Sequence, residues 1–221
     1  MQRHSTIFGL RDGAGVLAVG AHPDDIELGM GATLARLTQQ GNLNVQCLIL
    51  SKCDETLPRS FPAGTLEEEC KKSLQILGVE NQKIQFQNFP VRRFTEFRQE
   101  ILQHLINLKM EMELDVVFVP STRDIHQDHS VVSQEAVRSF KNKTLLGYEL
   151  SWNVLSSQRG LYVEIDDDSA DKKMSALSSY KSQKSRPYMN NQTQFSLLRT
   201  HGLDIGKEYA ETFEVIRLVQ N

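Results

Sequence analysis

Short apolar runs alternate with amphipathic segments along most of this chain, and the alternation limits the folds it can form. The runs Val16–Val19, Val45–Leu50 and Val116–Val119 are continuously apolar, as strands covered on both faces are. Strands that alternate with helices predict a mostly parallel sheet with helices on both faces. We therefore expect an α/β fold, a single Rossmann-like domain over residues 1–221.

The individual elements follow from apolar spacing and from glycine or proline at their ends. Strands are predicted at Val16–Val19, Val45–Leu50, Ile84–Phe86, Val116–Val119, Leu145–Leu150, Leu161–Ile165 and Thr212–Val219. Helices are predicted at Ile26–Gln40, Leu66–Leu77, Phe94–Met110, Ser130–Phe140, Ser169–Lys181 and Gln192–Arg199.

Charge and hydropathy exclude several classes of protein. The 25 Lys and Arg against 28 Asp and Glu leave a net charge of −3, so no basic excess indicates a nucleic-acid partner. No apolar run approaches the roughly 20 residues of a membrane-spanning helix. The segment Met1–Gly15 is polar and mixed, without the apolar core of a signal peptide. We expect a cytoplasmic protein.

The three cysteines, Cys47, Cys53 and Cys70, show no CxxC spacing. Neither a disulfide framework nor a thiolate zinc site is expected from them. Cys47 lies in an apolar run and is interpreted as core packing. Cys53 directly follows that run and could face a cleft, but no neighbouring base indicates a nucleophilic thiol, so a packing role is favoured.

Two polar clusters follow predicted strands. The first is Gly20–Asp25, with the sequence GAHPDD, and the second is Asp124–His129, with the sequence DIHQDH. Because the carboxyl ends of parallel strands lie at the same edge of a sheet, where ligands bind, we expect the clusters to meet. Together they supply three imidazoles and four carboxylates.

This donor set predicts a catalytic metal site. His22 and Asp25 are three residues apart, as are His126 and His129, so each turn can direct two side chains to one point. Two imidazoles and a carboxylate that leave one position open are typical of a hydrolytic zinc ion. Asp24 and one of the two later histidines would then be free for proton transfer. Spacing alone does not say which histidine binds metal.

Simpler interpretations exist for each motif taken alone. An HPDD loop often only caps a helix, because Asp after a strand is a good N-cap. Two such clusters at predicted strand ends, in a chain with 6 histidines, favour a metal site over a helix cap. The remaining histidines, His4, His104 and His201, are assigned a terminus, an amphipathic helix and a loop near a helix end.

The motifs resemble those of the PIG-L/LmbE-like deacetylases, zinc-dependent hydrolases that remove acetyl groups from N-acetylglucosamine-type sugars. The specific matches are the two metal motifs, and weaker ones extend the similarity over nearly the whole chain. The matching stretches are Val19–Gly29, Gly31–Leu34, Pro120–His129, Lys173–Gln183 and Tyr209–Phe213.

The resemblance implies a role for each site residue. His22, Asp25 and His129 become the ligands of one Zn²⁺ per chain, and Fe²⁺ or Co²⁺ would suit the same donors. Asp24 becomes the general base. His126 becomes the protonated partner that stabilises the oxyanion or serves the leaving amine, and Asp128 becomes the residue that orients His126. The resemblance also implies a homo-oligomer, a trimer or hexamer.

One loop departs from the family pattern. The family often carries a substrate-binding Arg shortly before the Glu of its second helix, but Thr65 and Leu66 precede Glu69 here. Arg59 is the only candidate upstream. The loop Ser51–Ala63 is therefore where substrate preference transfers least.

The sequence thus predicts a metal-dependent N-deacetylase of an N-acetyl amino sugar or its conjugate. A hydrolase of another amide or ester at the same metal is the first alternative. The second alternative is a non-catalytic binding module in which the metal only joins two loops, but such a site does not need Asp24 and His126. Dinucleotide binding is disfavoured because no GxGxxG follows the first strand.

Overall fold

The computed structural model describes residues 7–40 and 42–220, and these form one seven-stranded sheet. The strand order is β3-β2-β1-β4-β5-β7-β6, with β7 antiparallel to both neighbours and the first five strands of that order parallel. The strands are β1 (Gly15–Gly20), β2 (Asn44–Ile49), β3 (Ile84–Phe86), β4 (Val116–Pro120), β5 (Thr144–Tyr148), β6 (Leu161–Ile165) and β7 (Tyr209–Arg217).

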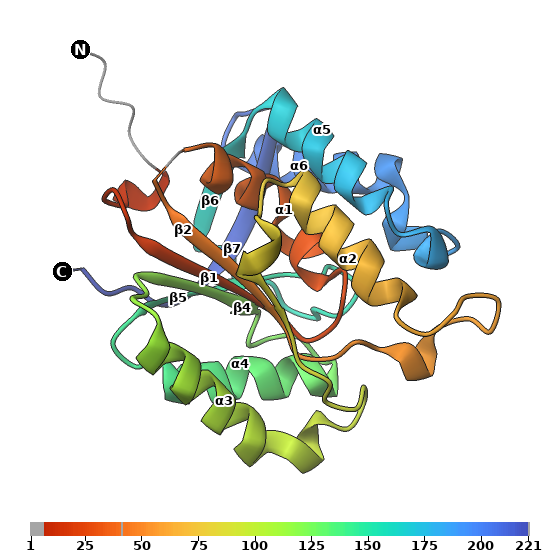
Figure 1. Cartoon of the computed structure of the whole chain (residues 1–221). Coiled ribbons are helices and arrows are strands. Elements are labelled where there is room, and N and C mark those ends of the chain that lie inside the picture. The colour runs from red at the N-terminus through yellow and green to blue at the C-terminus, as the bar shows by residue number, and fades with distance from the viewer. Residues whose placement is uncertain (1–6, 41, 221) are drawn as a thin grey trace.

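Helices cover both faces of the sheet (Figure 1). Helices α3 and α4 lie against one face and pack on each other, while α1, α2, α5 and α6 form the layer on the opposite face. The predicted fold class is confirmed. The helices are α1 (Asp25–Gln39), α2 (Thr65–Ile76), α3 (Arg98–Glu111), α4 (Gln127–Ser139), α5 (Asp167–Leu177) and α6 (Asn191–Asp204).

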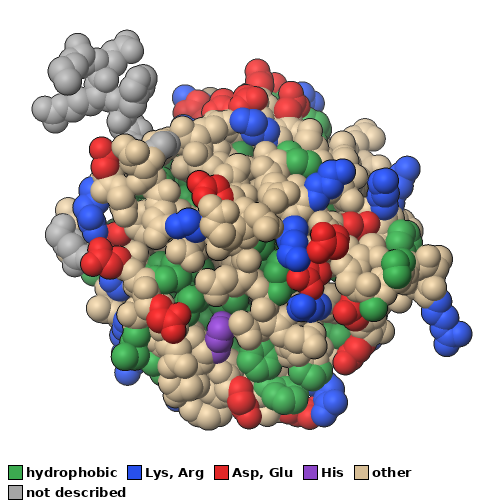
Figure 2. Space-filling view, in the orientation of Figure 1, with side chains coloured by type: hydrophobic (Ala, Val, Ile, Leu, Met, Phe, Trp, Pro, Cys, Tyr) green, Lys and Arg blue, Asp and Glu red, His purple; other side chains and the backbone are tan. Residues whose placement is uncertain are grey.

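The core is divided between the two faces of the sheet. Alternate residues of β1 point to opposite sides, so Val16 and Ala18 join one apolar cluster and Leu17 and Val19 join the other. All of β1 is buried, which is the property of a central parallel strand. On the face seen in Figure 2, acidic and basic side chains are interspersed. None of the described helices is long and apolar enough to cross a membrane.

Several element boundaries differ from the predicted ones. Helix α4 begins at Gln127 rather than Ser130, because His126 accepts a hydrogen bond from the backbone N–H of Asp128 and so caps it. Strand β7 begins at Tyr209 rather than Thr212 and pairs with β6 as far as Tyr209. His201 lies inside α6 rather than in a loop. The first two differences reflect a hydrogen bond and a strand pairing that apolar spacing does not show.

Helix α1 is broken at Met30, whose φ of −147° and ψ of 20° are not helical. The Leu28 carbonyl accepts a hydrogen bond from Lys173 Nζ at 2.8 Å, and the Ala32 and Thr33 amides donate to the Glu211 carboxylate at 3.1 and 2.6 Å. Lys173 and Glu211 are themselves paired at 2.8 Å and buried. This ion pair therefore satisfies both sides of the break.

The first half of α1 packs tightly against the sheet. Gly29 faces the Tyr148 ring so closely that an added methyl group would overlap it. The Tyr148 hydroxyl donates to the carbonyl of Val19, in the strand that leads to the first cluster. The broken helix and this contact fix the segment that carries His22 to Asp25.

Candidate active site

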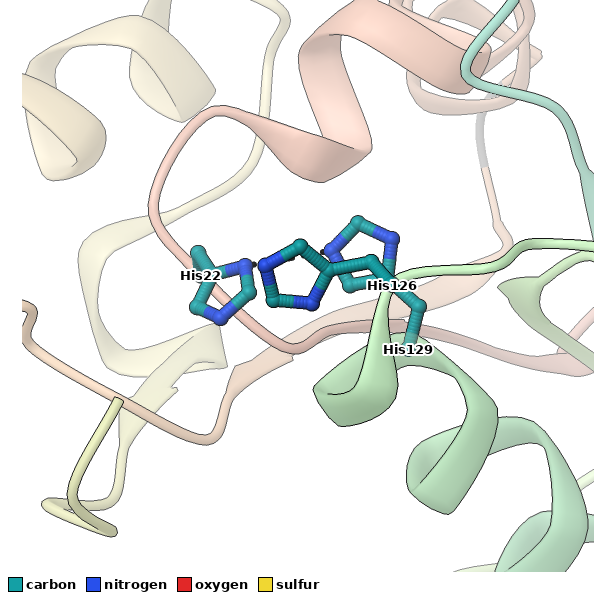
Figure 3. Close-up of side chains that lie close together, drawn as sticks. All are labelled: His22, His126 and His129. Carbon is teal, nitrogen blue, oxygen red and sulfur yellow. Dashed lines mark hydrogen bonds between the residues drawn. The ribbon is translucent and has the colours of Figure 1, made fainter. Parts of the chain in front are cut away.

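The two polar clusters lie side by side because β1 and β4 are parallel neighbours. The chain leaves β1 at Gly20 and enters α1 at Asp25, and it leaves β4 at Pro120 and enters α4 at Gln127. Figure 3 shows His22 facing His126 and His129, which come from the start of α4. The predicted meeting of the clusters at the carboxyl ends of the strands is therefore observed.

Three donor atoms lie at short mutual distances. Nδ1 of His22 is 3.1 Å from Nε2 of His129, and Oδ2 of Asp25 lies 3.5 and 3.3 Å from these two nitrogens. Donors that surround one zinc ion tetrahedrally with bonds of about 2.0–2.1 Å are roughly 3.3 Å apart. The three atoms thus have the spacing that a small divalent cation requires.

A second set of donors is also close. His126, His22 and His129 each offer a ring nitrogen, and the three atoms lie within 4.8 Å of one another. The two sets share His22 and His129 and differ in whether Asp25 or His126 completes them.

Carboxylates hold both of the other ring nitrogens. Nε2 of His22 is 2.9 Å from Oδ2 of Asp128, and Nδ1 of His129 is 2.7 Å from Oδ2 of Asp124. Such contacts fix the tautomer of a metal-binding imidazole and its orientation. The sequence placed Asp124 in the second cluster but assigned it no role, because its contact depends on how the loop folds back on α4.

The predicted role of Asp128 as the residue that orients His126 is wrong for its carboxylate. That carboxylate contacts His22 and accepts hydrogen bonds from the backbone N–H groups of Arg92 and Phe94, at 2.5 and 3.2 Å. Only the backbone N–H of Asp128 reaches His126. The first turn of α4 thus brings the Asp128 carboxylate to His22 rather than to the His126 ring.

The electrostatics of the cluster favour added positive charge. Burial lowers the pKa of His129, but the carboxylates of Asp25 and Asp124 outweigh it and raise that pKa to about 10. Burial opposes the same effect at His22, where Asp25 and Asp128 raise the pKa. Burial of Asp25 is likewise outweighed by the two imidazoles, which hold its pKa well below the usual range. The donor set therefore fits a divalent cation in charge as well as in spacing.

Asp24 lies beside the donor triangle in a strained backbone conformation. Its φ of 89° is in the left-handed region, and its side chain makes no capping hydrogen bond to α1. Burial and the carboxylates of Asp25 and Glu27 raise its pKa, against the charges of His129 and Arg186. The capping interpretation of this residue is thus not supported, and its carboxylate can accept a proton.

His126 has one ring nitrogen committed. Its Nδ1 accepts the backbone N–H of Asp128 at 3.2 Å, so Nε2 is the atom that carries the proton in the neutral ring. Burial and the charges of His129 and His22 lower its pKa. The ring is therefore disposed to donate a hydrogen bond from Nε2 while it is neutral.

A cavity of about 330 Å³ opens onto these side chains. Of the loop Ser51–Ala63, only Cys53 and Thr56 line it, and Arg59 does not. Burial raises the pKa of the Cys53 thiol, which agrees with the packing role predicted for it. Five further polar or aromatic residues that line the cavity were not identified from the sequence: Arg92, Trp152, Gln183, Arg186 and Tyr188.

The remaining histidines lie elsewhere. His104 is on α3 and His201 is on α6, and neither joins the cluster. His4 lies outside the residues that the structure describes.

The fold and the site define a class: a Rossmann-like α/β enzyme whose His/Asp cluster opens onto a cavity at the carboxyl ends of its strands. Residues 17–140 match the family model described as PIG-L, GlcNAc-PI de-N-acetylase. The chain belongs to this family of deacetylases, as the sequence motifs predicted.

Relatives and solved structures extend the match beyond the family model. The chain is 31% identical over 175 residues to the uncharacterized deacetylase YaiS of Escherichia coli K12, covering 76% of this chain and 91% of that protein. The conserved protein TT1542 of Thermus thermophilus superposes with a TM-score of 0.77 and 26% identity, over 93% of this chain and 96% of that one.

A third similarity is to the N,N'-diacetylchitobiose deacetylase of Pyrococcus horikoshii. It has a TM-score of 0.72 and 22% identity, over 97% of this chain and 89% of that one. At this identity the similarity shows a shared fold.

Proposed function

We propose that the protein is a metal-dependent hydrolase that removes the acetyl group from an N-acetylated amino sugar of the N-acetylglucosamine type, or from its conjugate. The observation that carries the proposal is the donor triangle of His22, Asp25 and His129 beside a carboxylate that takes no part in it, Asp24. A structural metal site that only joined two loops would not need that carboxylate. Membership of a deacetylase family supports the reaction type.

His22, Asp25 and His129 would hold one Zn²⁺, and the same donors suit Fe²⁺ or Co²⁺. A cation bound there supplies Lewis acidity, which polarises an amide carbonyl and acidifies water. Asp124 and Asp128 keep the two imidazoles in the orientation that directs His129 Nε2 and His22 Nδ1 inward.

Asp24 acts as the general base. Its carboxylate takes a proton from the attacking water as the water oxygen bonds to the acetyl carbon. Its raised pKa suits this task, because a base is most effective when its pKa is near the working pH. Protonated Asp24 then returns this proton to the nitrogen as the C–N bond breaks, and the products are acetate and the amine.

His126 stabilises the transition state through the ring nitrogen that the backbone does not hold. Nε2 is free to donate to the oxyanion or to the departing nitrogen, because Nδ1 is held by the backbone of α4. A preorganised donor of this kind lowers the barrier because it needs no reorganisation during the reaction.

Acetate release from a panel of N-acetylglucosaminyl conjugates tests the proposal. We expect release from at least one conjugate, its loss after treatment with a chelator, and its recovery when Zn²⁺ or Co²⁺ is restored. N-acetylated amino acids and acetate esters serve as the comparison set. Cleavage of that set alone would contradict the sugar specificity, and activity that survives complete metal removal would contradict the mechanism.

A further inference from the structure

Two arginines line the active-site cavity without an acidic partner. Arg92 and Arg186 both contribute to its wall, and among the described residues neither guanidinium has an ion pair or hydrogen bond. The next residue in the chain, Arg93, does have an acidic partner. Its guanidinium group makes two hydrogen bonds to Glu96, at 2.9 and 2.6 Å.

Hydrogen bonds hold the backbone of Arg92 in place, whereas its guanidinium group has none within the described part of the chain. Its φ of 66° is a left-handed conformation that a side chain rarely adopts. Its N–H donates to Asp128 and its carbonyl accepts from Gln127. The same carboxylate of Asp128 contacts His22, so Asp128 links the backbone of Arg92 directly to the catalytic cluster.

The backbone of Arg186 is also held in place. Its N–H donates to the carbonyl of Gln183 at 2.9 Å, and its own carbonyl accepts the N–H of Met189 at 3.0 Å. Two residues later, Tyr188 stacks on Trp152 with ring centroids 4.2 Å apart and an angle of 10° between planes. The stack joins the short helix η6 (Pro187–Met189) to the loop after β5.

We propose that Arg92 and Arg186 bind an oxyanion, a carboxylate or a phosphate, that the substrate carries beside its N-acetyl sugar, and that they select acidic conjugates over neutral ones. This inference rests on the proposed function. Guanidinium groups bind both oxyanions through paired hydrogen bonds, and a fixed backbone reduces the entropy lost on binding.

The competing explanation is that the arginines only balance the carboxylates of the site. The positive charge of Arg186 does act on Asp24, where it opposes the larger effects of burial and of Asp25 and Glu27 on the pKa. An arginine with this role alone would affect neutral and acidic substrates equally. The two explanations therefore differ in substrate preference.

The test compares acetate release from three substrates: methyl N-acetylglucosaminide, N-acetylglucosamine 1-phosphate and the N-acetylglucosaminide of glycolic acid. We expect the wild-type enzyme to prefer at least one acidic substrate at least tenfold in kcat/KM, mainly through KM. Arg92→Gln and Arg186→Gln should each lower kcat/KM at least five times more for that substrate than for the neutral one. Arg59→Gln, an exposed arginine that does not line the cavity, is the control and should keep the wild-type preference.

The two acidic substrates identify the source of the oxyanion, because a preference for one of them names phosphate or carboxylate. The inference would be overturned if the wild-type enzyme cleaved the neutral substrate and both acidic ones with equal kcat/KM. Equal losses for all substrates in both variants would overturn it in favour of charge balance. If a variant does not fold, the wild-type KM still decides: only for acidic substrates should it rise between 50 and 500 mM NaCl.

Binding to the metal-free wild-type protein separates this inference from the proposed function. Calorimetry should show tighter binding of N-acetylglucosamine 1-phosphate, or of the glycolic acid conjugate, than of N-acetylglucosamine. Absence of acetate release from every substrate would contradict the proposed function, whereas equal affinity for acidic and neutral sugars would contradict the role of the two arginines.

Discussion

Replacing Glu211 with Gln should destabilise the protein severely, because this carboxylate completes the broken helix α1. Glu211 is 2% exposed and accepts from two backbone amides and from Lys173 Nζ. The amide of Gln has nearly the same size but turns one acceptor into a donor and leaves the Lys173 charge buried without a counter-charge. Breaking a buried ion pair in this way costs about 3–5 kcal/mol.

That loss is a large share of the total, since domains are stable by about 5–15 kcal/mol. Urea unfolding followed by circular dichroism measures it, and with a slope of about 3 kcal/mol per molar the midpoint should fall by about 1–2 M. Glu164→Gln is the matched control. Its carboxylate pairs with Lys207 at 2.9 Å, but the two side chains are 55% and 48% exposed, so about 0–1 kcal/mol is expected.

The double variant Lys173→Met/Glu211→Gln tests the reasoning more directly. If the pair acts as a unit, the double variant should be more stable than the sum of the single effects predicts, by at least about 1 kcal/mol. A Glu211→Gln variant that unfolds within about 1 kcal/mol of wild type would refute the account of the helix break. Strict additivity would show that the two residues stabilise α1 independently.

Four further outcomes concern the site. Purified protein should hold about one divalent cation per chain by elemental analysis, and His22→Ala or His129→Ala should remove it; full metal content in both variants would contradict the ligand assignment. Asp24→Asn should keep the metal but lower kcat by about two to four orders of magnitude, whereas Asp25→Asn should weaken metal affinity; near-normal turnover of Asp24→Asn would assign the base elsewhere. His126→Ala should lower kcat substantially at unchanged metal content, and an unaltered kcat would exclude the donor role. Because the surrounding carboxylates outweigh burial and raise the pKa of His129 to about 10, a cation must displace a proton there, so zinc affinity measured by chelator competition should strengthen up to about tenfold per pH unit between pH 6 and 9.

The fold could be predicted because its strands are evident from short stretches of sequence. Val16–Val19 and Val116–Val119 are continuous apolar runs, and these two strands are buried on both faces in the structure. Parallel strands in one sheet bring their carboxyl ends together, so the meeting of the two polar clusters followed from the topology. The ends of elements were less accessible. The break at Met30 depends on Lys173 and Glu211, far away in sequence.

The site divides in the same way. The residue types and their i, i+3 spacing made His22, Asp25, His126 and His129 candidates, and the geometry brings all four together. The partner of Asp128 could not be read from the chain. Sequence proximity indicated His126, but the first turn of α4 carries the Asp128 carboxylate to His22.

The sequence by itself determined the class of fold, the two clusters and the family, because these depend on local spacing and on short motifs. The tertiary structure decided which carboxylate orients which imidazole, and it placed Arg92 and Arg186 in one cavity although they are 94 positions apart in the chain. Such contacts arise from the packing of loops that are distant in the chain. Side-chain direction in a loop depends on backbone angles, such as the positive φ of Asp24 and Arg92, and neither residue type favours such an angle strongly enough to reveal it beforehand.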